Sequence, residues 1–205
     1  MDSRNNIAAV RRVFQQYQDY YTARDPANLD ACMQLFTRGH DVEVVGTGAI
    51  APGADEWCDS HALARGLTAG DWEGWGDVRF DVDGAVIHAL GDVAWLTTTA
   101  TVTTVYPVED NLRAAVAQAK QVLAEDGDDE TRRKNMLMWA TTALAEAHRG
   151  DIYVWPIRFS AVLAREDGDW RFRQAHFSFP TTRFPDERRT GVGPRPNRRI
   201  DATAD

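Results

Sequence analysis

The fold of this chain is decided by the stretch Tyr153–Arg188, YVWPIRFSAVLAREDGDWRFRQAHFSFPTTRFPDER. Two runs rich in aromatic, β-branched and aliphatic residues lie on either side of a short acidic segment, and such runs favour β-strands. Asp167-Gly168 in that segment is a strong hairpin signal, because a tight primed turn needs residues that tolerate a positive φ angle. The pattern predicts a long antiparallel hairpin that pairs Tyr153–Arg165 with Trp170–Phe179.

Two arrangements of this hairpin are open, and they differ in which side chains share a face. A two-residue turn at Asp167-Gly168 places Arg158 on the face away from His176, whereas a three-residue turn with a bulge places them together. Hydrophobicity favours the second arrangement, because it gathers the apolar residues on one face. The other face then carries a set of polar residues, Arg158, Ser160, Gln174, His176 and Ser178. That polar face is either a pocket wall, with His176 in contact with a ligand, or a dimer contact.

The chain before the hairpin begins with helices. Apolar residues at i, i+3, i+4 and i+7 predict an amphipathic helix over residues 7–21. Asp25-Pro26 ends this helix and starts a short second one, with Asp25 as its N-cap. A short strand over residues 41–45 follows, and then a glycine-rich bend.

A third helix is expected over Ala54–Leu67, with Gly66 and Gly70 marking its end. Trp72 and Trp75 then follow in a glycine-rich loop. Two tryptophans on a loop usually pack as a lid or plug over a core.

Strands dominate the middle of the chain until a helical segment interrupts them. Residues 77–83 alternate apolar and charged side chains, as a half-buried strand does. Gly91-Asp92 forms a turn into the threonine- and valine-rich run Val93–Val105, which is expected to pair with the strand before it. Two apolar stripes within Glu109–Gly150 predict an inserted helical hairpin. The tail, residues 190–205, is expected to be flexible because it holds almost no apolar residue.

Composition and charge narrow the range of functions. The formal net charge is −8 and the sequence pI is about 5.1, which argues against a general binder of nucleic acid or anionic membranes. No run approaches the ~20 apolar residues that span a bilayer, and the N-terminus lacks the apolar core of a signal peptide. Cys32 and Cys58 each fall in a helical pattern and are expected to be buried, reduced thiols. We therefore expect a soluble, cytoplasmic protein.

Helices that precede an antiparallel sheet, here expected to have four to six strands, indicate an α+β domain whose helices cover one face of a curved sheet. With the motifs Val44–Gly48, Gly91–Trp95 and Asp167–Ser178, this order resembles the nuclear transport factor 2-like superfamily. Within it, the chain is most similar to the SnoaL-like group, which also resembles the association domain of calcium/calmodulin-dependent protein kinase II. The resemblance implies a single domain over residues 1–189, with residues 109–150 as a helical insertion. It further implies a cone-shaped curved sheet wrapped around the N-terminal helices, an interior pocket, and a homodimer formed through the outer face of the sheet.

The resemblance also implies catalytic residues. In ketosteroid isomerases of this superfamily, the carboxylate base precedes a glycine by three residues on an early strand, and Glu43 has this spacing to Gly46. A carboxylate buried among valines would have a raised pKa, as proton abstraction near neutral pH requires. Tyr17 or Tyr21 could donate a hydrogen bond to the developing oxyanion. The alternatives are a solvent-facing Glu43 and two tyrosines that serve only the core.

Other residues complete the expected site. His176 is the second catalytic candidate. Four residues are expected to contact the ligand: Trp57, Trp75, Trp95 and Arg158. Trp95 lies in the middle of a strand, between Ala94 and Leu96, and is expected to be largely buried.

We expect neither a metal nor a cofactor. The histidines lack metal-ligand spacing, two lone cysteines cannot make a structural zinc site, and no glycine-rich nucleotide loop occurs. The sequence thus favours a SnoaL-like protein that binds an unidentified small molecule and acts as a cofactor-independent isomerase, cyclase or dehydratase. The alternative is a non-catalytic dimerisation or ligand-sensing module.

Overall fold

In the computed structural model, strands β6 (Ile152–Glu166) and β7 (Asp169–Ser178) form the hairpin that the sequence predicts. Glu166 pairs with Asp169, so the turn has two residues. Asp167 and Gly168 have φ angles of 52° and 91°, and two positive φ angles are the mark of a type I′ turn. The turn residues therefore have the conformation that their sequence requires.

A bulge in this hairpin decides which side chains share a face. Val162 pairs with Gln174, but the next residue, Leu163, pairs with Phe172, so Arg173 is the extra residue. Beyond the bulge Ser160 pairs with His176, and Arg158 lies on the same face. The prediction that Arg158 and His176 share a face is therefore confirmed. The prediction of a three-residue turn is wrong, because the turn has two residues and the bulge lies in the middle of the strand.

The structure describes residues 3–39, 42–49, 51–53, 56–105, 107–124, 129–130, 132–133, 136–137, 140 and 151–179. The chain divides into two compact units. One contains Met1–Thr104 and Trp155–Arg188, and the other contains Val105–Val154 and Arg189–Asp205.

The strands in the described part of the chain form one seven-stranded sheet in the order β2-β1-β7-β6-β5-β3, with β4 paired to β5. The remaining strands are β1 (Glu43–Val45), β2 (Trp57–Cys58), β3 (Asp77–Phe80), β4 (Val86–Leu90) and β5 (Val93–Val105). We expected four to six antiparallel strands, and this is wrong in two respects. The two-residue β2 is too short to show any periodicity, and β1 pairs with β7 in parallel. The predicted pairing of β4 with β5 across Gly91-Asp92 is confirmed.

Helices α1 (Ser3–Ala23) and α2 (Leu29–Met33) begin the chain as predicted, separated by a 3₁₀ turn over Pro26–Asn28. The Asp25 carboxylate accepts a hydrogen bond from the backbone of Ala27, which confirms Asp25 as the cap of this turn.

The third helix lies later in the chain than the sequence predicted. Helix α3 covers His61–Gly74 rather than Ala54–Leu67, and the Ser60 side chain caps its start. It runs through Gly66 and Gly70, so neither glycine ends it. Trp72 therefore lies in the helix and Trp75 caps it, whereas Trp57 and Cys58 lie in a strand.

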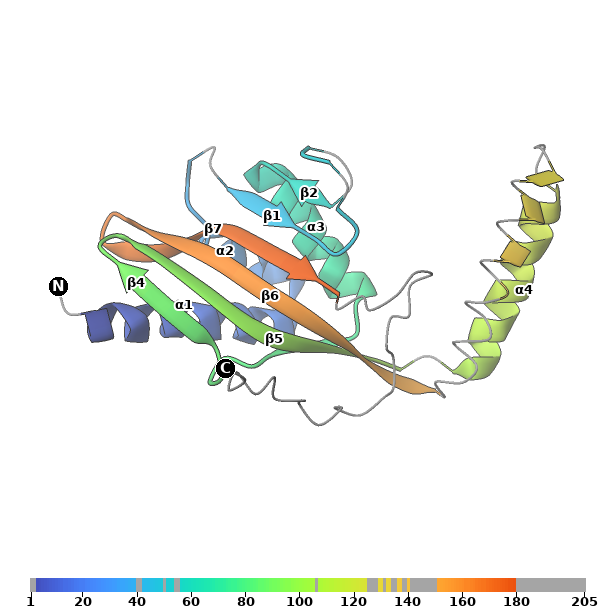
Figure 1. The fold of residues 1–205 in the computed structure, drawn as a ribbon, viewed down its shortest axis with the longest axis horizontal. Coiled ribbons are helices and arrows are strands. Elements are labelled where there is room, and N and C mark those ends of the chain that lie inside the picture. The colour runs from blue at the N-terminus through green and yellow to red at the C-terminus, as the bar shows by residue number, and fades with distance from the viewer. Residues whose placement is uncertain are drawn as a thin grey trace, which may run out of the picture. The chain divides into compact units, whose positions relative to one another are not determined.

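Helix α1 lies along one face of the sheet and packs against β3, β4 and β7 (Figure 1). Between them lies a cluster of aromatic residues whose ring centroids are 4.9–6.4 Å apart. Its members are Phe14, Tyr17, Tyr21, Phe36, Phe80, Phe159, Phe172 and Phe177, all buried. We call the face of the sheet that meets these rings the inner face and the opposite face the outer face. The predicted α+β class, with N-terminal helices on a curved sheet, is confirmed.

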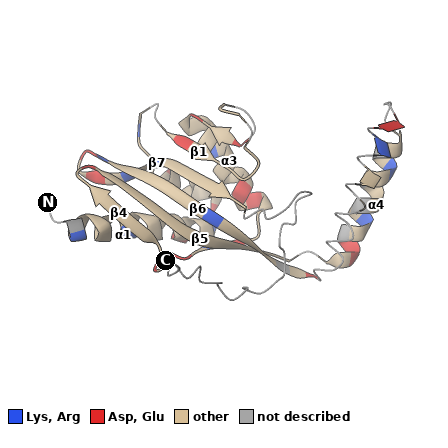
Figure 2. Ribbon diagram, in the orientation of Figure 1, with Lys and Arg blue, Asp and Glu red and all other residues tan. Residues whose placement is uncertain are grey.

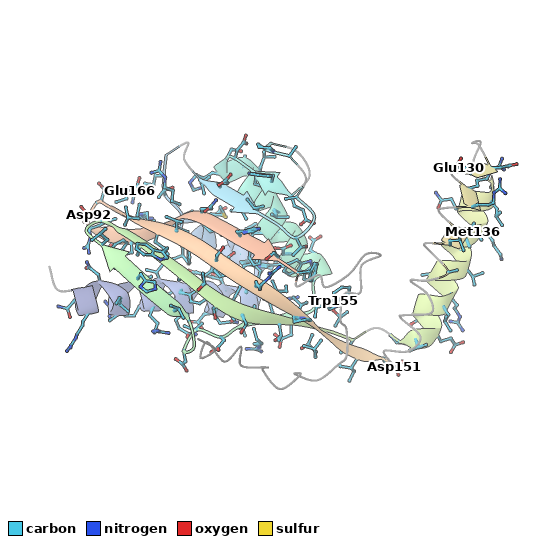
Figure 3. The ribbon with its side chains drawn as sticks, viewed as in Figure 1. Asp92, Glu130, Met136, Asp151, Trp155 and Glu166 are labelled. Atoms are coloured by element: carbon cyan, nitrogen blue, oxygen red, sulfur yellow. The ribbon has the colours of Figure 1, made fainter. Side chains whose placement is uncertain are left out.

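The turns of the two hairpins meet at one end of the sheet, where Figure 3 labels Asp92 and Glu166. The backbone N–H of Arg165 donates to the carbonyl of Asp92 at 2.9 Å, and the Arg165 guanidinium lies 3.2 Å from the Asp92 carboxylate. Glu166 pairs with the guanidinium of Arg171 at 3.3 Å. The contacts of Arg165 with Asp92 connect the β4–β5 turn with the β6–β7 hairpin, and the pair of Glu166 and Arg171 lies within that hairpin.

Helix α4 (Val108–Ala124) in the second unit confirms that a helix interrupts the strands. It presents acidic residues in its first turn, and Figure 2 shows both charges along its length. The Asp151 carboxylate accepts a hydrogen bond of 2.8 Å from the backbone of Val108. Most of the second expected helix, over residues 125–150, and the tail beyond residue 189 lie outside the described residues. Among the described helices, none combines the length and the hydropathy that a membrane span requires.

Candidate functional site

The sheet separates the predicted site residues into two groups. In β1 the side chain of Val44 is buried in the core, so Glu43, its neighbour, lies on the outer face. In β7 the ring of Phe177 packs against Tyr21 on the inner face, so His176 also lies on the outer face. The structure does not bring Glu43 together with Tyr17 or Tyr21, as the isomerase-like arrangement required.

The inner face carries a buried polar cluster, which we call the interior cluster: Tyr17, Tyr21, Cys32 and Asp71. The hydroxyl of Tyr21 donates a hydrogen bond of 3.0 Å to Oδ2 of Asp71, a residue of α3 that is only 8% exposed. The ring of Tyr17 lies 4.9 Å from that of Tyr21. Its hydroxyl is close enough to influence the pKa of Tyr21, but it makes no hydrogen bond of good geometry with any described residue.

Burial controls the protonation of this cluster. It raises the pKa of Asp71 to about 7, an effect that the hydrogen bond from Tyr21 and the charge of Arg24 oppose. Burial also raises the pKa of both tyrosines well above the usual value, and that of the Cys32 thiol to about 12. Near neutral pH the tyrosines and the thiol are therefore neutral, and Asp71 can gain or lose a proton.

Asp71 is not among the predicted site residues, because the predicted third helix ends at Leu67 and α3 extends to Gly74. In a helix that extends to Gly74, Asp71 lies seven residues after Ala64 and three residues after Thr68, so the three share one stripe of the helix. All three are buried. An acidic residue on an apolar helical stripe was the signal that could have identified it.

On the outer face, Glu43 is held by two donors. Its carboxylate accepts a hydrogen bond of 2.7 Å from Nε1 of Trp57 and one of 2.6 Å from Nε2 of Gln174. Each donor uses a different oxygen, and the contacts tie together β1, β2 and β7. Glu43 is therefore an anchor for its neighbours and not a free base.

A groove of about 560 Å³ opens beside Trp57 on the outer face, and we call it the outer groove. Its walls come from β1 and the glycine loop after it, β2, β6 and β7. It brings together three of the residues that the sequence analysis selected, Trp57, Arg158 and His176, next to Gln174 and Ser178.

Trp75 and Trp95 occupy different environments. Trp75 is half-buried on the inner side, where its ring packs edge-on against Phe177 with the centroids 5.9 Å apart. Trp95 is 43% exposed and stacks on His88 on the outer face of β4 and β5, with the centroids 5.3 Å apart. The expectation that Trp95 is largely buried is wrong, because the alternation along β5 sends Ala94 and Leu96 inward instead.

A larger groove, of about 750 Å³, lies between α1, α2 and the β6–β7 turn. None of its lining residues belongs to the interior cluster or the outer groove. Two of its arginines, Arg165 and Arg171, are paired with Asp92 and Glu166. Arg12, Asp19 and Asp169 line it as well, so it presents charges of both signs to a ligand.

No group of three or more histidine, cysteine, aspartate or glutamate side chains able to hold a metal ion is found in the part of the chain that the structure describes. Cys32 and Cys58 are both buried and free, but only Cys32 lies in a helix.

Comparison with known proteins identifies the family and the fold of this chain. The sequence matches the SnoaL-like domain over residues 13–116, about half of the chain. No curated protein matches the sequence.

Solved structures with low sequence identity share the fold. An NTF2-like protein of unknown function from Pseudomonas putida KT2440 is 13% identical, with a TM-score of 0.57 over 94% of this chain and 99% of the other. A protein from Streptomyces avermitilis, provisionally assigned as a dehydratase of the NTF2-like family, is 12% identical, with a TM-score of 0.54 over 87% and 98% of the two chains. A protein from Xanthomonas campestris, provisionally assigned as a calcium/calmodulin-dependent protein kinase II association domain, is 13% identical, with a TM-score of 0.50 over 87% and 89%.

Proposed function

Since the chain belongs to the SnoaL-like domain family, we propose that it binds a small molecule at the interior cluster and transforms it by acid–base chemistry without a cofactor, as an isomerase, cyclase or dehydratase. One observation carries this proposal: a buried carboxyl group, Asp71, accepts a hydrogen bond from Tyr21 beside the unpartnered hydroxyl of Tyr17. The provisional assignment of the Streptomyces avermitilis protein as a dehydratase supports the same class of reaction.

Each residue of the cluster has a role that its geometry suits. Tyr21 occupies Oδ2 of Asp71 and leaves Oδ1 for a proton. As a carboxylate, Asp71 takes the proton from a carbon next to a carbonyl group, and the electron pair of that C–H bond forms an enolate. The Tyr17 hydroxyl donates a hydrogen bond to the enolate oxygen. Return of the proton to a different carbon completes an isomerisation, and loss of a β-hydroxyl group as water completes a dehydration.

Asp71 replaces Glu43 as the base in this proposal. Both carboxylate oxygens of Glu43 accept hydrogen bonds, and Glu43 lies on the opposite face of the sheet from the tyrosines. A buried carboxyl group with a pKa of about 7 has the proton affinity that a base needs near neutral pH.

Access to Asp71 passes Trp75 in this proposal. The backbone N–H of Trp75 donates to the carbonyl of Asp71 at 2.9 Å, and its half-buried ring lies against Phe177. The guanidinium of Arg24 also donates to the Trp75 carbonyl. In this proposal, a rotation of the Trp75 side chain opens the interior cluster to a substrate.

Hydrogen–deuterium exchange tests the chemistry without a known substrate. The protein is incubated in D₂O with a panel of cyclic ketones and β-hydroxy ketones, and NMR follows deuterium uptake at the carbon next to the carbonyl. We expect accelerated uptake into at least one compound, lowered by ~10²-fold or more in Asp71→Asn. Glu43→Gln is the control and should retain the rate. Equal rates for the wild-type protein and Asp71→Asn would contradict the role of Asp71.

We also propose that the chain forms a homodimer through the outer face. Large apolar side chains are exposed on this face of β4 and β5: Val86, Leu90, Val93 and Trp95. Few soluble monomers expose a contiguous apolar patch of this kind. The low-identity structure assigned as an association domain supports oligomerisation of the fold. Analytical ultracentrifugation tests it, and a monomer at micromolar concentration would contradict it.

A further inference from the structure

We propose that the outer groove is a second ligand site, which binds a small carboxylate with a flat apolar body. This site is separate from the proposed catalytic site, because the polar side chains that line it, Arg158, His176 and Ser178, lie on the opposite face of the sheet from Tyr21. Three features of the groove favour this ligand: its charge, the hydrogen bonds that its backbone N–H groups already make, and the position of its aromatic walls.

Arg158 gives the outer groove its charge. Among the described residues that line the groove, it is the only one with a formal charge, in a protein whose net charge is −8. One guanidinium nitrogen donates to the carbonyl of Phe179 at 2.8 Å, which fixes the side chain beside the groove. The remaining N–H groups make no other hydrogen bond to a described residue, and a guanidinium fork matches the two oxygens of a carboxylate.

The neighbours of Arg158 suit the same ligand. His176 and Ser178 lie on the same face of the hairpin and line the groove, so both can donate a hydrogen bond to an anion. Glu43, the nearest acidic residue in β1, does not line the groove, and its two oxygens are occupied by Trp57 and Gln174.

The backbone of the glycine loop after β1 favours a carboxylate over a phosphate as the ligand. Phosphate sites usually draw on several backbone N–H groups of a glycine-rich loop. Here the N–H of Gly46 donates to the carbonyl of Glu56 at 2.9 Å, and that of Gly48 donates to the Glu56 carboxylate at 2.6 Å. A Cβ atom at Gly46 would overlap with the Glu56 carboxylate, so Glu56 fills the space inside the loop. Since the groove offers one arginine and its loop is filled by Glu56, it favours a ligand with a single negative charge.

The walls of the groove favour a flat ligand. Trp57 is fixed by its hydrogen bond to Glu43, so its indole ring is held in one orientation at the groove. Phe179 lines the groove too, and its ring packs against Trp155 with the centroids 5.3 Å apart. Aromatic rings held in this way offer a planar ligand contact area at little entropic cost.

Benzoate is the probe that tests this proposal, and benzamide is its neutral match. Each is titrated into the ¹⁵N-labelled full chain, with inorganic phosphate as a third arm, while NMR follows the Trp57 indole N–H and the amides of Gly46 and Thr47. We expect benzoate to shift these signals with a Kd of roughly 1–10 mM, as for other fragments of its size, and to bind more tightly than benzamide or phosphate.

Variants link the binding to the groove. Arg158→Gln should weaken benzoate binding by about tenfold or more, because it removes a charge-assisted hydrogen bond. Arg38→Gln, at an exposed arginine paired with Asp167, is the matched control and should bind as the wild type does. Asp71→Asn should also bind normally, so this test does not depend on the proposed catalytic function.

Several results would overturn the proposal. One is the absence of any shift at 50 mM benzoate, a level about fivefold above the expected range of Kd. Others are an affinity for benzamide equal to that for benzoate, or a tighter binding of phosphate than of benzoate. The last is a benzoate affinity in Arg158→Gln equal to that of the wild type. If ultracentrifugation shows a dimer and the groove signals do not respond to benzoate, a second copy of the chain covers the groove and the small-molecule site is rejected.

Discussion

The two faces of one sheet use acidic residues in opposite ways. On the inner face, Asp71 is buried among aromatic rings with one hydrogen bond from Tyr21, and burial raises its pKa to about 7. On the outer face, Glu43 is half-buried and two donors use both of its oxygens. Burial without full compensation leaves the Asp71 carboxyl group able to exchange a proton near neutral pH, whereas the Glu43 carboxylate holds Trp57 and Gln174 in place. The environment of a carboxylate, and not its position on an early strand, indicates which one can act as a base.

Neighbouring residues of β7 give the largest test of this comparison. Phe177→Ala should destabilise the protein by ~3–5 kcal/mol, because the ring is buried and packs against Tyr21, Trp75, Phe80 and Phe159. His176→Ala, one residue earlier on the outer face, should cost less than about 1 kcal/mol. Urea unfolding measures both. Similar losses in the two variants would show that the faces do not differ as described.

The pH dependence of stability is expected to reveal Asp71. Its pKa is about 7 in the folded state and about 3.9 in an unfolded chain, so the folded state binds more protons between these values. The neutral form therefore stabilises the fold at low pH, and this contribution is lost as the pH rises from about 4 to 7. The loss should be on the order of 3 kcal/mol.

Thermal unfolding of Asp71→Asn against the wild-type protein measures this effect. The variant cannot ionise at this position, so it should lack this part of the decline in Tm between pH 4 and 7. Glu73→Gln, at an exposed position of the same helix, is the matched control and should keep the wild-type slope. Parallel curves for the wild-type protein and Asp71→Asn would mean that Asp71 is ionised throughout.

The smallest expected effect on the fold is at Trp95. Trp95→Ala should change the free energy of unfolding of a monomer by less than about 1 kcal/mol, because the side chain is 43% exposed and contacts mainly His88. The same substitution should weaken the proposed dimer. Sedimentation velocity at several concentrations measures the association, with Thr97→Ala, on the same face of β5, as the control. An equally strong association in Trp95→Ala would place the dimer contact elsewhere.

The sequence by itself determined the elements with strong local signals. The type I′ turn at Asp167-Gly168 follows from residues that tolerate positive φ angles, and Gly91-Asp92 joins its two strands for a similar reason. The amphipathic period of α1 placed Tyr17 and Tyr21 in the core, as confirmed by their burial. Local backbone preference and hydrophobic period act within a few residues, so the sequence expresses them directly.

Only the tertiary structure decided which side chains meet. The bulge at Arg173 sets the face of His176, and the parallel entrance of β1 beside β7 sets the face of Glu43. A shift of one residue reverses every side chain of a strand. Hydrophobicity favoured the observed face of His176, but no local signal placed the bulge at Arg173 or paired β1 with β7. Asp71 joins Tyr21 across 50 positions of sequence only because α3 extends past two glycines and packs near α1. The candidate base, the anchor and the groove all depend on these long-range contacts, which sequence periodicity does not encode.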